Sequence, residues 1–391
     1  MSRRYAFLRR PRPAWVDVGS PYPARFLLEL HSHALNHGMP AQRRAGPLLA
    51  WVGRRGLPVR PAAAALRRLP TGPVPQVDSL IDEVARRWPL LAASSDRLPA
   101  RAPALSALVV QRASGRYVFV LGGSRHPLLL LKPGLPAGEE DPEEDALRAV
   151  DGAGIAPRRL PSVAGMRVEE GLPGRPLWVL PPGRPGWSSS YAAAYDALGA
   201  GLVRLSETTA HRGPHDLDHY LALVARHLRS SATAALVDAA RRDLRSLDAV
   251  SLQHRDLSAQ NWLVDGSSFV GLVDWETAHP GAVPGHDALQ AAVALLEHGV
   301  ALRRWSQADV VRSFVQAWHD EPLFGLARSW HRECVRAATG STRLADPLVV
   351  AFFARRLGRR ISGGGPVTLS VATLETMLEV VTASAGPPSE P

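Results

Sequence analysis

Four polar residues in the middle of the chain have the types and spacing needed for chemistry on a phosphate group. His254, Asp256 and Asn261 form the pattern H-x-D-x-x-x-x-N, and Asp274 ends the second of two apolar runs that follow. A carboxylate such as Asp256 can accept the proton of an attacking hydroxyl. Asn261 and Asp274 offer oxygen ligands to Mg²⁺, which keeps substrate phosphates as further ligands. The pattern therefore predicts a magnesium-dependent site that brings a phosphate and a hydroxyl together.

The composition draws attention to one further residue. Lys and Arg together number 46, and Lys132 is the only lysine among them. Lysine is a compact point charge whereas arginine is a planar fork, so the two are not interchangeable in a tight phosphate site. A lysine that survived by chance could lie anywhere, so the value of Lys132 depends on its place in the fold.

The elements that must position these residues divide into a β-rich part and a helical part. Five strand candidates are expected at residues 105–111, 116–121, 127–132, 162–169 and 176–180. Lys132 ends the third strand, and the acidic stretch 139–145 then opens a helix, because proline and carboxylates favour a first turn. The segment 250–275 predicts a hairpin whose rims present Asp256, Asn261 and Asp274 to one site.

The rest of the chain beyond the strands is mostly helical. Periodic apolar patterns predict helices at residues 191–206, 217–228 and 233–247. The first hundred residues are rich in Pro, Arg and Ala, with helical patches expected at 26–35, 48–52 and 80–91. Strands with one helix followed by a helical half indicate an α+β protein with a cleft between two lobes.

These motifs resemble the aminoglycoside phosphotransferase and choline kinase branch of the protein-kinase-like superfamily. The resemblance covers residues 104–292, and its elements agree in spacing, flanking strands and order. It implies a bilobal protein-kinase-like fold, with a small antiparallel β-sheet lobe carrying one helix and a larger, mostly helical lobe. We expect a helical N-terminal extension at 1–100, a small nucleotide-binding lobe at 101–182, and a large lobe with the catalytic loop and acceptor site at 183–391.

The resemblance also implies how a nucleotide, ATP or GTP, is bound together with Mg²⁺. Lys132 would hold the α- and β-phosphates and pair with a helix carboxylate, for which Glu143 fits best and Glu144 is a close competitor. The turn containing Ser114 and Gly115 would cover the phosphates with backbone N–H groups.

A hinge between the lobes is expected near residues 179–182, where Val179 and Leu180 would contact the adenine. The two prolines that follow remove two N–H donors there. By the same resemblance Asp256 is the catalytic base, and Asn261 and Asp274 hold Mg²⁺. The implied reaction is transfer of the γ-phosphoryl group to a hydroxyl of a small molecule, such as an antibiotic, sugar, nucleoside or amino alcohol.

Three further residues would support the catalytic loop. His254 and Arg255 precede the base, and Asp287 occupies the position of a carboxylate that braces the loop in similar proteins. Only twelve residues separate Asp274 from Asp287, so there is little loop to hold a peptide, which argues against a protein kinase. A catalytically silent nucleotide-binding module is the other alternative.

The net charge of +10 is compatible with a nucleic acid, an anionic membrane or an anionic substrate as partner. The arginines are spread along the whole chain and no nucleic-acid module is recognisable, so no nucleic-acid partner is expected. No apolar run is long enough to span a membrane, and the arginine-interrupted N-terminus is unlike a signal peptide, so we expect a cytoplasmic protein. The sequence leaves the acceptor and the oligomeric state open.

Overall fold

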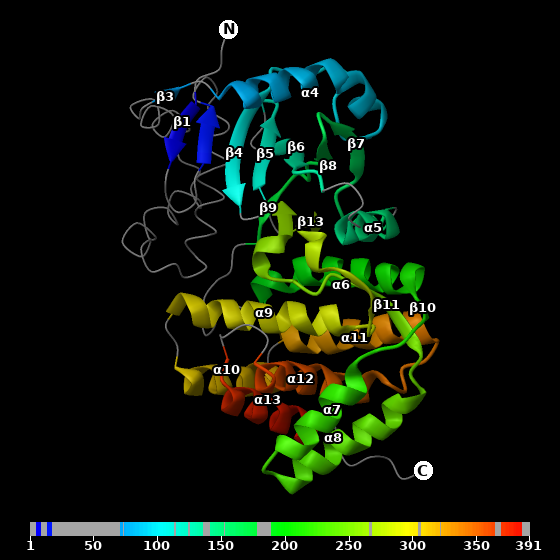
Figure 1. Cartoon of the computed structure of the whole chain (residues 1–391). Coiled ribbons are helices and arrows are strands. Elements are labelled where there is room, and N and C mark those ends of the chain that lie inside the picture. The colour runs from blue at the N-terminus through cyan, green and yellow to red at the C-terminus, as the bar shows by residue number, and fades with distance from the viewer. Residues whose placement is uncertain are drawn as a thin grey trace. The chain divides into compact units, whose positions relative to one another are not determined.

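The computed structural model describes residues 5–8, 14–17, 71–72, 74–112, 115–123, 126–135, 141–151, 153–177, 189–265, 268–303, 306–320, 322–363 and 369–384. The chain forms two compact units, one of residues 1–148 with 156–176 and one of residues 149–155 with 177–391 (Figure 1). Ser114, Val179, Leu180 and the expected helical patches at 26–35 and 48–52 lie outside the described residues.

The first unit is built on an eight-stranded antiparallel sheet. Its strands are, in spatial order, β3 (Thr71–Gly72), β1 (Tyr5–Leu8), β2 (Ala14–Asp17), β4 (Ser106–Arg112), β5 (Gly115–Leu121), β6 (Pro127–Lys132), β8 (Met166–Glu170) and β7 (Arg159–Val163). The short strand β9 (Arg175–Pro176) ends the unit. Side chains alternate between the two faces, so Leu129 and Leu131 of β6 lie in one apolar cluster while Leu130 contacts another. Lys132 therefore lies on the same face as Leu130.

Helix α4 (Pro75–Ala93) covers the face of the sheet that carries Leu129 and Leu131 (Figure 1). Proline in the first turn suits a helix start, and Val84, Trp88 and Leu91 follow at the spacing of one helix face. All three are buried in the cluster with the sheet. Burial of side chains of this size stabilises a fold by about 1.5–3 kcal/mol each.

Two parts of this unit differ from the expectation. Of residues 1–100, the described ones form three short strands as well as α4, and all belong to the same compact unit as the strands after residue 101. Residues 162–169, expected as one strand, span the turn of the hairpin β7–β8. Ala164 and Gly165 have φ values of 50° and 76° there, and this local backbone turn leaves no mark on the apolar pattern.

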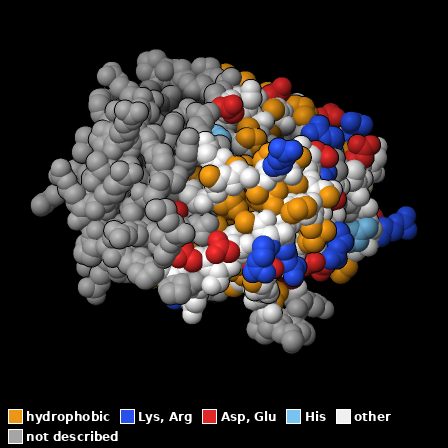
Figure 2. Space-filling view, turned by 90° about the horizontal axis from the view of Figure 1, so that it is seen from above, with side chains coloured by type: hydrophobic (Ala, Val, Ile, Leu, Met, Phe, Trp, Pro, Cys, Tyr) orange, Lys and Arg blue, Asp and Glu red, His pale blue; other side chains and the backbone are white. Residues whose placement is uncertain are grey.

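Charges on the surface of this unit are mixed in sign. Figure 2 shows apolar side chains bordered by basic and acidic ones rather than a field of one charge. Arg86 and Arg87 both pair with Glu83 on α4, and Arg148 pairs with Asp145 on helix α5 (Pro142–Ala149). These three arginines are therefore each paired with a carboxylate of their own helix.

The second unit consists mainly of helices. They are α6 (Ser189–Thr209), α7 (Leu217–His227), α8 (Ser231–Asp243), α9 (His286–Arg303), α10 (Gln307–Asp320), α11 (Pro322–Thr339), α12 (Ala345–Ile361) and α13 (Val371–Ser384). Helix α11 packs on α6 and α9, and α12 packs on α7, α8 and α13 (Figure 1). Among the helices of the described residues, none combines the length and apolar character needed to cross a membrane.

Short strands and 3₁₀ turns interrupt the helices of this unit between residues 211 and 282. Strand β11 (Ala249–Gln253) lies between β10 (His211–Arg212) and β14 (His279–Ala282), and β12 (Trp262–Asp265) forms a hairpin with β13 (Ser268–Leu272). Three 3₁₀ turns accompany them, η2 (Leu244–Ser246), η3 (Ala259–Asn261) and η4 (Trp275–Thr277). The expected hairpin at 250–275 is thus present, with the H-x-D-x-x-x-x-N pattern between β11 and β12.

Candidate functional site

The first group of candidate residues lies at the end of β6 and is centred on Lys132. Its Nζ is 2.5 Å from Oε1 of Glu143 on α5 and 2.8 Å from Oε1 of Glu169 on β8. All three side chains are buried. Burial lowers the pKa of Lys132, but the charges of Glu169 and Glu143 outweigh it, so the pKa is raised and the ammonium stays protonated. We call these three residues the lysine cluster.

The cluster settles which carboxylate of α5 contacts the lysine. Glu143 does so, whereas Glu144 points to Arg148 at 3.1 Å and to Arg159 at 3.8 Å. The second carboxylate, Glu169, was not expected from the sequence. Burial raises the pKa of Glu169, and the opposing charge of Lys132 does not cancel this effect. One feature of the sequence could have indicated Glu169. It lies two residues after Arg167 on β8, so both side chains are on the face of the sheet that carries Lys132.

Arg167 ties the lysine cluster to the start of α5. It lies opposite Lys132 in the β6–β8 ladder, donates from Nη1 to Oδ2 of Asp141 at 2.5 Å, and is 3.5 Å from Glu143. Asp141 also accepts the Glu144 N–H, which caps the helix. Burial raises the pKa of Asp141, but Arg167 and this N–H outweigh burial and hold the pKa below its usual value. The helix that carries Glu143 is therefore anchored to the sheet at its first turn.

Gly115 lies next to the same end of β6. It begins β5 with φ at 129°, a conformation that favours glycine, and a Cβ on it would come within 2.6 Å of Pro133 Cγ. Because Pro133 follows Lys132, Gly115 lies close to the residue after the lysine. This position suits a backbone that covers a ligand of Lys132.

The second group lies in the helical unit, on the loop after β11. The carboxylate of Asp287, at the start of α9, accepts the backbone N–H groups of His254 at 2.5 Å and Arg255 at 3.0 Å. Gln253 Oε1 in turn accepts the N–H of Asp287 at 3.0 Å. Burial raises the pKa of Asp287 against the opposing influence of His254 and the two N–H groups. These bonds clamp the loop backbone, and Arg255 adopts the left-handed conformation with φ at 66°.

His254 connects the loop to the strand end that carries Asp274. Its Nδ1 accepts the Asp256 N–H at 3.3 Å, so the proton is on Nε2, which donates to the Val273 carbonyl at 3.0 Å. The imidazole also lies against the Trp275 ring, with 4.6 Å between centroids. Asp274 has φ at 69°, a left-handed conformation that few residues other than Gly, Asn and Asp adopt readily.

Asp256 and Asn261 are joined directly. The amide Nδ2 of Asn261 donates to the backbone carbonyl of Asp256 at 2.9 Å and to its Oδ2 at 3.1 Å. The Asn261 carbonyl accepts the Val273 N–H at 3.0 Å, next to Asp274. Asn261 is buried whereas Asp256 is partly exposed. The structure thus brings His254, Asp256, Asn261, Asp274 and Asp287 together in one unit.

The donor atoms of this group fit a magnesium ion. The side chain of Asn261 donates both of its hydrogen bonds to Asp256 from Nδ2, so its amide oxygen takes no part in them. Asp274 adds a carboxylate. Within the described residues no group of three or more His, Cys, Asp or Glu side chains could form a metal site of protein ligands alone. Mg²⁺ is commonly held by one or two protein oxygens together with substrate phosphates, so two such ligands agree with its chemistry.

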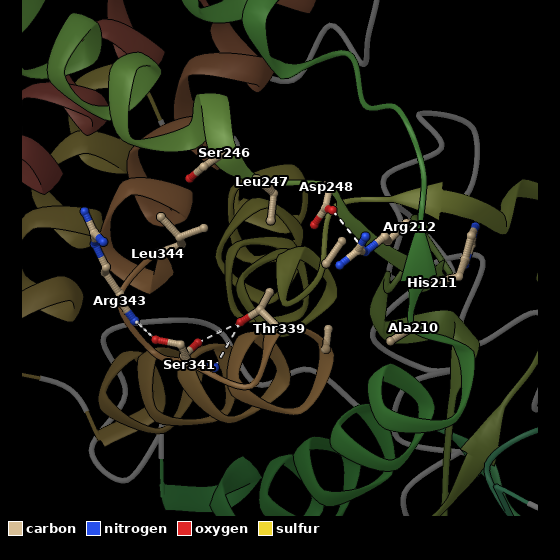
Figure 3. A pocket seen from close by; sticks show the side chains of 12 residues that line it. Ala210, His211, Arg212, Ser246, Leu247, Asp248, Thr339, Ser341, Arg343 and Leu344 are labelled. Atoms are coloured by element: carbon tan, nitrogen blue, oxygen red, sulfur yellow. Dashed lines mark hydrogen bonds and ion pairs between the residues drawn. The ribbon is translucent and has the colours of Figure 1, made fainter.

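A surface hollow of about 520 Å³ lies elsewhere in the helical unit (Figure 3). Its lining includes the exposed ion pair between Arg212 Nε and Asp248 Oδ2 at 3.2 Å, and Thr339 at the end of α11. It opens at the beginning of β11, whereas the loop of residues 254–261 follows the other end of that strand. The loop residues do not line it.

Two residues that position the loop were not expected from the sequence. Gln253 precedes the H-x-D-x-x-x-x-N pattern without being part of it, and His331 lies far from it in the sequence. The ring nitrogens of His331 contact the carbonyls of Gly285 and Ala345, each at 2.9 Å. Gly285 has φ at 80°, and a Cβ there would lie 2.6 Å from His331 Nδ1. His331 therefore contacts the segment that leads to Asp287. No local sequence pattern reveals this contact, because the two segments are far apart in the sequence.

The family of the chain follows from a comparison with known sequences. The family described as "Phosphotransferase enzyme family" matches residues 107–334, which is more than half of the chain. The chain belongs to this family. The matched region of this phosphotransferase-family chain runs from β4 into α11, so it contains the lysine cluster and the loop that carries Asp256 and Asn261. No curated protein matches the sequence.

Solved structures of low sequence identity also match this family member. An aminoglycoside phosphotransferase from Alicyclobacillus acidocaldarius is 14% identical over 81% of this chain and 97% of that one, with a TM-score of 0.41. A macrolide 2′-phosphotransferase from Brachybacterium faecium is 17% identical over 73% of this chain and 90% of that one, with a TM-score of 0.33. A choline kinase from Cryptosporidium parvum is 12% identical, covering 72% and 85%, with a TM-score of 0.34.

Proposed function

We propose that this protein transfers the γ-phosphoryl group of ATP or GTP, with Mg²⁺, to the hydroxyl of a small molecule. Membership of the phosphotransferase family supports the reaction class. The observation that carries the assignment to residues is the pair of hydrogen bonds from Asn261 to Asp256, on a loop whose backbone is clamped by Asp287. A base and a metal ligand held together in this way match the needs of phosphoryl transfer.

In the proposed reaction, Asp256 orients the acceptor hydroxyl and takes its proton as the oxygen attacks the γ-phosphorus. The new bond joins that oxygen to phosphorus, the bond to the β,γ-bridging oxygen breaks, and the nucleoside diphosphate leaves. Lys132 binds the α- and β-phosphates, and Asn261 and Asp274 hold Mg²⁺. When bound, this ion would neutralise part of the negative charge of the phosphates. The Asn261 bond to Asp256 Oδ2 orients the carboxylate.

The remaining expectations enter the proposal in supporting roles. Glu143 keeps Lys132 in place, and the turn at Ser114 and Gly115 covers the phosphates. Val179 and Leu180, outside the described residues, stay predicted contacts of the adenine ring. Residues 101–182 then form the nucleotide-binding lobe and 183–391 the lobe with the acceptor site, while the role of residues 1–100 and a cytoplasmic location stay predictions.

The test is nucleotide consumption by the purified protein with Mg²⁺ and a panel of aminoglycosides, macrolides, sugars, nucleosides and amino alcohols, with ATP and GTP compared. We expect Asp256→Ala to lower turnover by about 10² to 10⁴-fold, the usual contribution of a general base, while nucleotide binding persists. Asp265→Ala, an exposed carboxylate of the same hairpin, serves as the matched control.

The outcomes separate the proposal from its alternatives. Turnover in Asp256→Ala equal to that of the unaltered protein would overturn the role of Asp256. Tight Mg-nucleotide binding without turnover on any acceptor would favour a silent binding module. Transfer of labelled phosphate to proteins rather than small molecules would favour a protein kinase.

A further inference from the structure

Three arginines of the helical unit approach the catalytic loop from two elements. Arg255 is part of the loop, and its N–H is held by Asp287. The neighbour of Asp287, His286, packs edge-on against Phe352 of α12 with 5.4 Å between ring centroids. Arg355 and Arg359 follow Phe352 by one and two turns on that helix. Helix α12 is therefore docked so that it brings two arginines towards the residue before the proposed base.

The electrostatics of the surrounding groups agree with this placement. Burial lowers the pKa of Arg255, and the like charges of Arg355 and Arg359 lower it further. Burial also lowers the pKa of His279 on β14, followed by the charges of Arg255 and Arg355. Arg255 and His279 thus both experience the positive charge of Arg355. We call Arg255, Arg355 and Arg359 the arginine cluster.

The carboxylates near the arginine cluster are already engaged. Asp287 accepts the two backbone N–H groups of the loop, and Asp216, before α7, pairs with Arg355 Nη2 at 3.0 Å. In the described part of the chain neither Arg255 nor Arg359 forms an ion pair, and both residues keep contact with solvent, although the guanidinium of Arg255 is half-buried. The Nε of Arg355 is buried without a hydrogen-bond partner.

Unused guanidinium groups beside a catalytic loop point to the charge of its substrate. A buried donor without a partner costs free energy, and two exposed like charges repel each other unless an anion joins them. The planar forks of arginine bind carboxylate and phosphate oxygens with two parallel hydrogen bonds. Arg355, packed over Tyr220 and held by Asp216, is already fixed in position for such a contact.

We propose that the acceptor carries an anionic group, a phosphate monoester or a carboxylate, which Arg255, Arg355 and Arg359 bind while the acceptor hydroxyl reaches Asp256. This inference rests on the proposed function, because it names the substrate class of the same site. A polycationic acceptor is disfavoured by the same charges, since like charges across an interface repel.

The first experiment uses inorganic phosphate as the probe and does not require the acceptor. Phosphate is titrated into the full-length protein with the nucleotide site saturated by Mg-ADP, and binding is followed by calorimetry. We expect binding that Arg359→Gln weakens about tenfold or more, as for loss of a hydrogen bond to a charged group. Arg360→Gln removes the same charge from the next position of α12 and is expected to bind phosphate like the unaltered protein.

Kinetics with matched acceptors form the second experiment. Glucose, glucose 6-phosphate and gluconate share hydroxyls but differ in charge, as do adenosine and adenosine monophosphate, and an aminoglycoside supplies the cationic case. We expect the anionic members to be preferred, with the sugar phosphate and the sugar acid distinguishing the two anions. Arg355→Lys keeps the positive charge but not the planar guanidinium group. It should raise KM for the preferred anionic acceptor more than it lowers kcat.

The possible outcomes are distinguishable. No phosphate binding to the unaltered protein, or equal binding by Arg359→Gln, would overturn the anion site. Efficient turnover of a neutral or cationic acceptor that is unaffected in Arg359→Gln would overturn the substrate class and leave the phosphotransferase function intact. Phosphate binding that depends on Arg359, without nucleotide turnover on any acceptor, would instead count against the proposed function and leave the anion site standing.

Discussion

The lysine cluster and the catalytic loop hold their functional groups by different means. Lys132 is positioned by side chains, because two buried carboxylates from two elements meet its ammonium. The catalytic loop is positioned through its backbone, because Asp287 accepts two consecutive N–H groups while Asp256 itself stays partly exposed. The first arrangement depends on a balance of charge and the second on the path of the chain.

This difference has a consequence for mutations. An imbalance of buried charge can be corrected by a second substitution that removes the excess charge. A backbone that has lost its clamp cannot be restored by altering the charge of a neighbour. Rescue by a second mutation should therefore succeed in the lysine cluster and fail at the loop.

The largest effect is expected for Asp287→Ala. It leaves the N–H groups of His254 and Arg255 without their charged acceptor inside the protein, which should lower the free energy of unfolding by about 4 kcal/mol. Turnover should also fall in the fraction that remains folded, because the loop that carries Asp256 is released. Denaturant unfolding and kcat report the two effects. Unchanged stability together with unchanged kcat would show that the clamp is dispensable.

Lys132→Met should come next. It leaves Glu143 and Glu169 buried without the ammonium, which should cost about 3 kcal/mol, the low end of the range for a broken buried ion pair. The double variant Lys132→Met/Glu169→Gln should regain much of that stability but not nucleotide affinity. Unfolding and nucleotide titrations measure both. A double variant no more stable than the single one would contradict the charge-balance account.

A pH dependence of stability is expected from the segment that precedes Asp287. Burial, followed by the charge of Arg355, holds the pKa of His286 well below its ordinary value of 6.5, and burial lowers that of His331. Below pH 6.5 the unfolded chain therefore binds protons that the folded protein does not bind. The free energy of unfolding is highest above that pH and decreases as the pH falls. When the pH falls from 7.5 to 5.5, the free energy of unfolding of His286→Phe should decrease by about 1 kcal/mol less than that of the unaltered protein.

The matched control for this pH experiment is the exposed His219→Gln, which should follow the unaltered protein. Unfolding at a series of pH values provides the measurement. If the slopes of His286→Phe and the unaltered protein coincide between those two pH values, His286 is not the source of the acid sensitivity.

The smallest effect should come from Glu144→Gln, compared with Glu143→Gln. Glu144 pairs with Arg148 on the exposed side of α5, and such surface pairs contribute about 0.5 kcal/mol or less. Glu143→Gln removes a buried partner of Lys132 and should reduce nucleotide affinity as well. Equal effects of the two variants on nucleotide affinity would contradict the contact seen for Glu143.

Local patterns predicted the elements well where the interactions are themselves local. Strands β4, β5 and β6 and helices α6, α7 and α8 lie where the apolar periodicity placed them, because alternation and helical spacing are set within a few residues. The hairpin β7–β8 was missed because a turn at Ala164 and Gly165 interrupts no apolar run. The short strands β1 and β2 were missed because they become strands only by pairing with each other and with β4.

By itself the sequence determined the kinds of group and their order along the chain. The spacing of Asp256 and Asn261 spans a single loop, and the place of Lys132 at a strand end follows from the strand pattern. Only the tertiary structure decided which groups meet across long separations. Consecutive helix residues point about 100° apart, so the choice of Glu143 over Glu144 depended on how α5 docks. The contacts of Glu169 with Lys132, and of α12 with the catalytic-loop segment, likewise arise only when distant segments pack together.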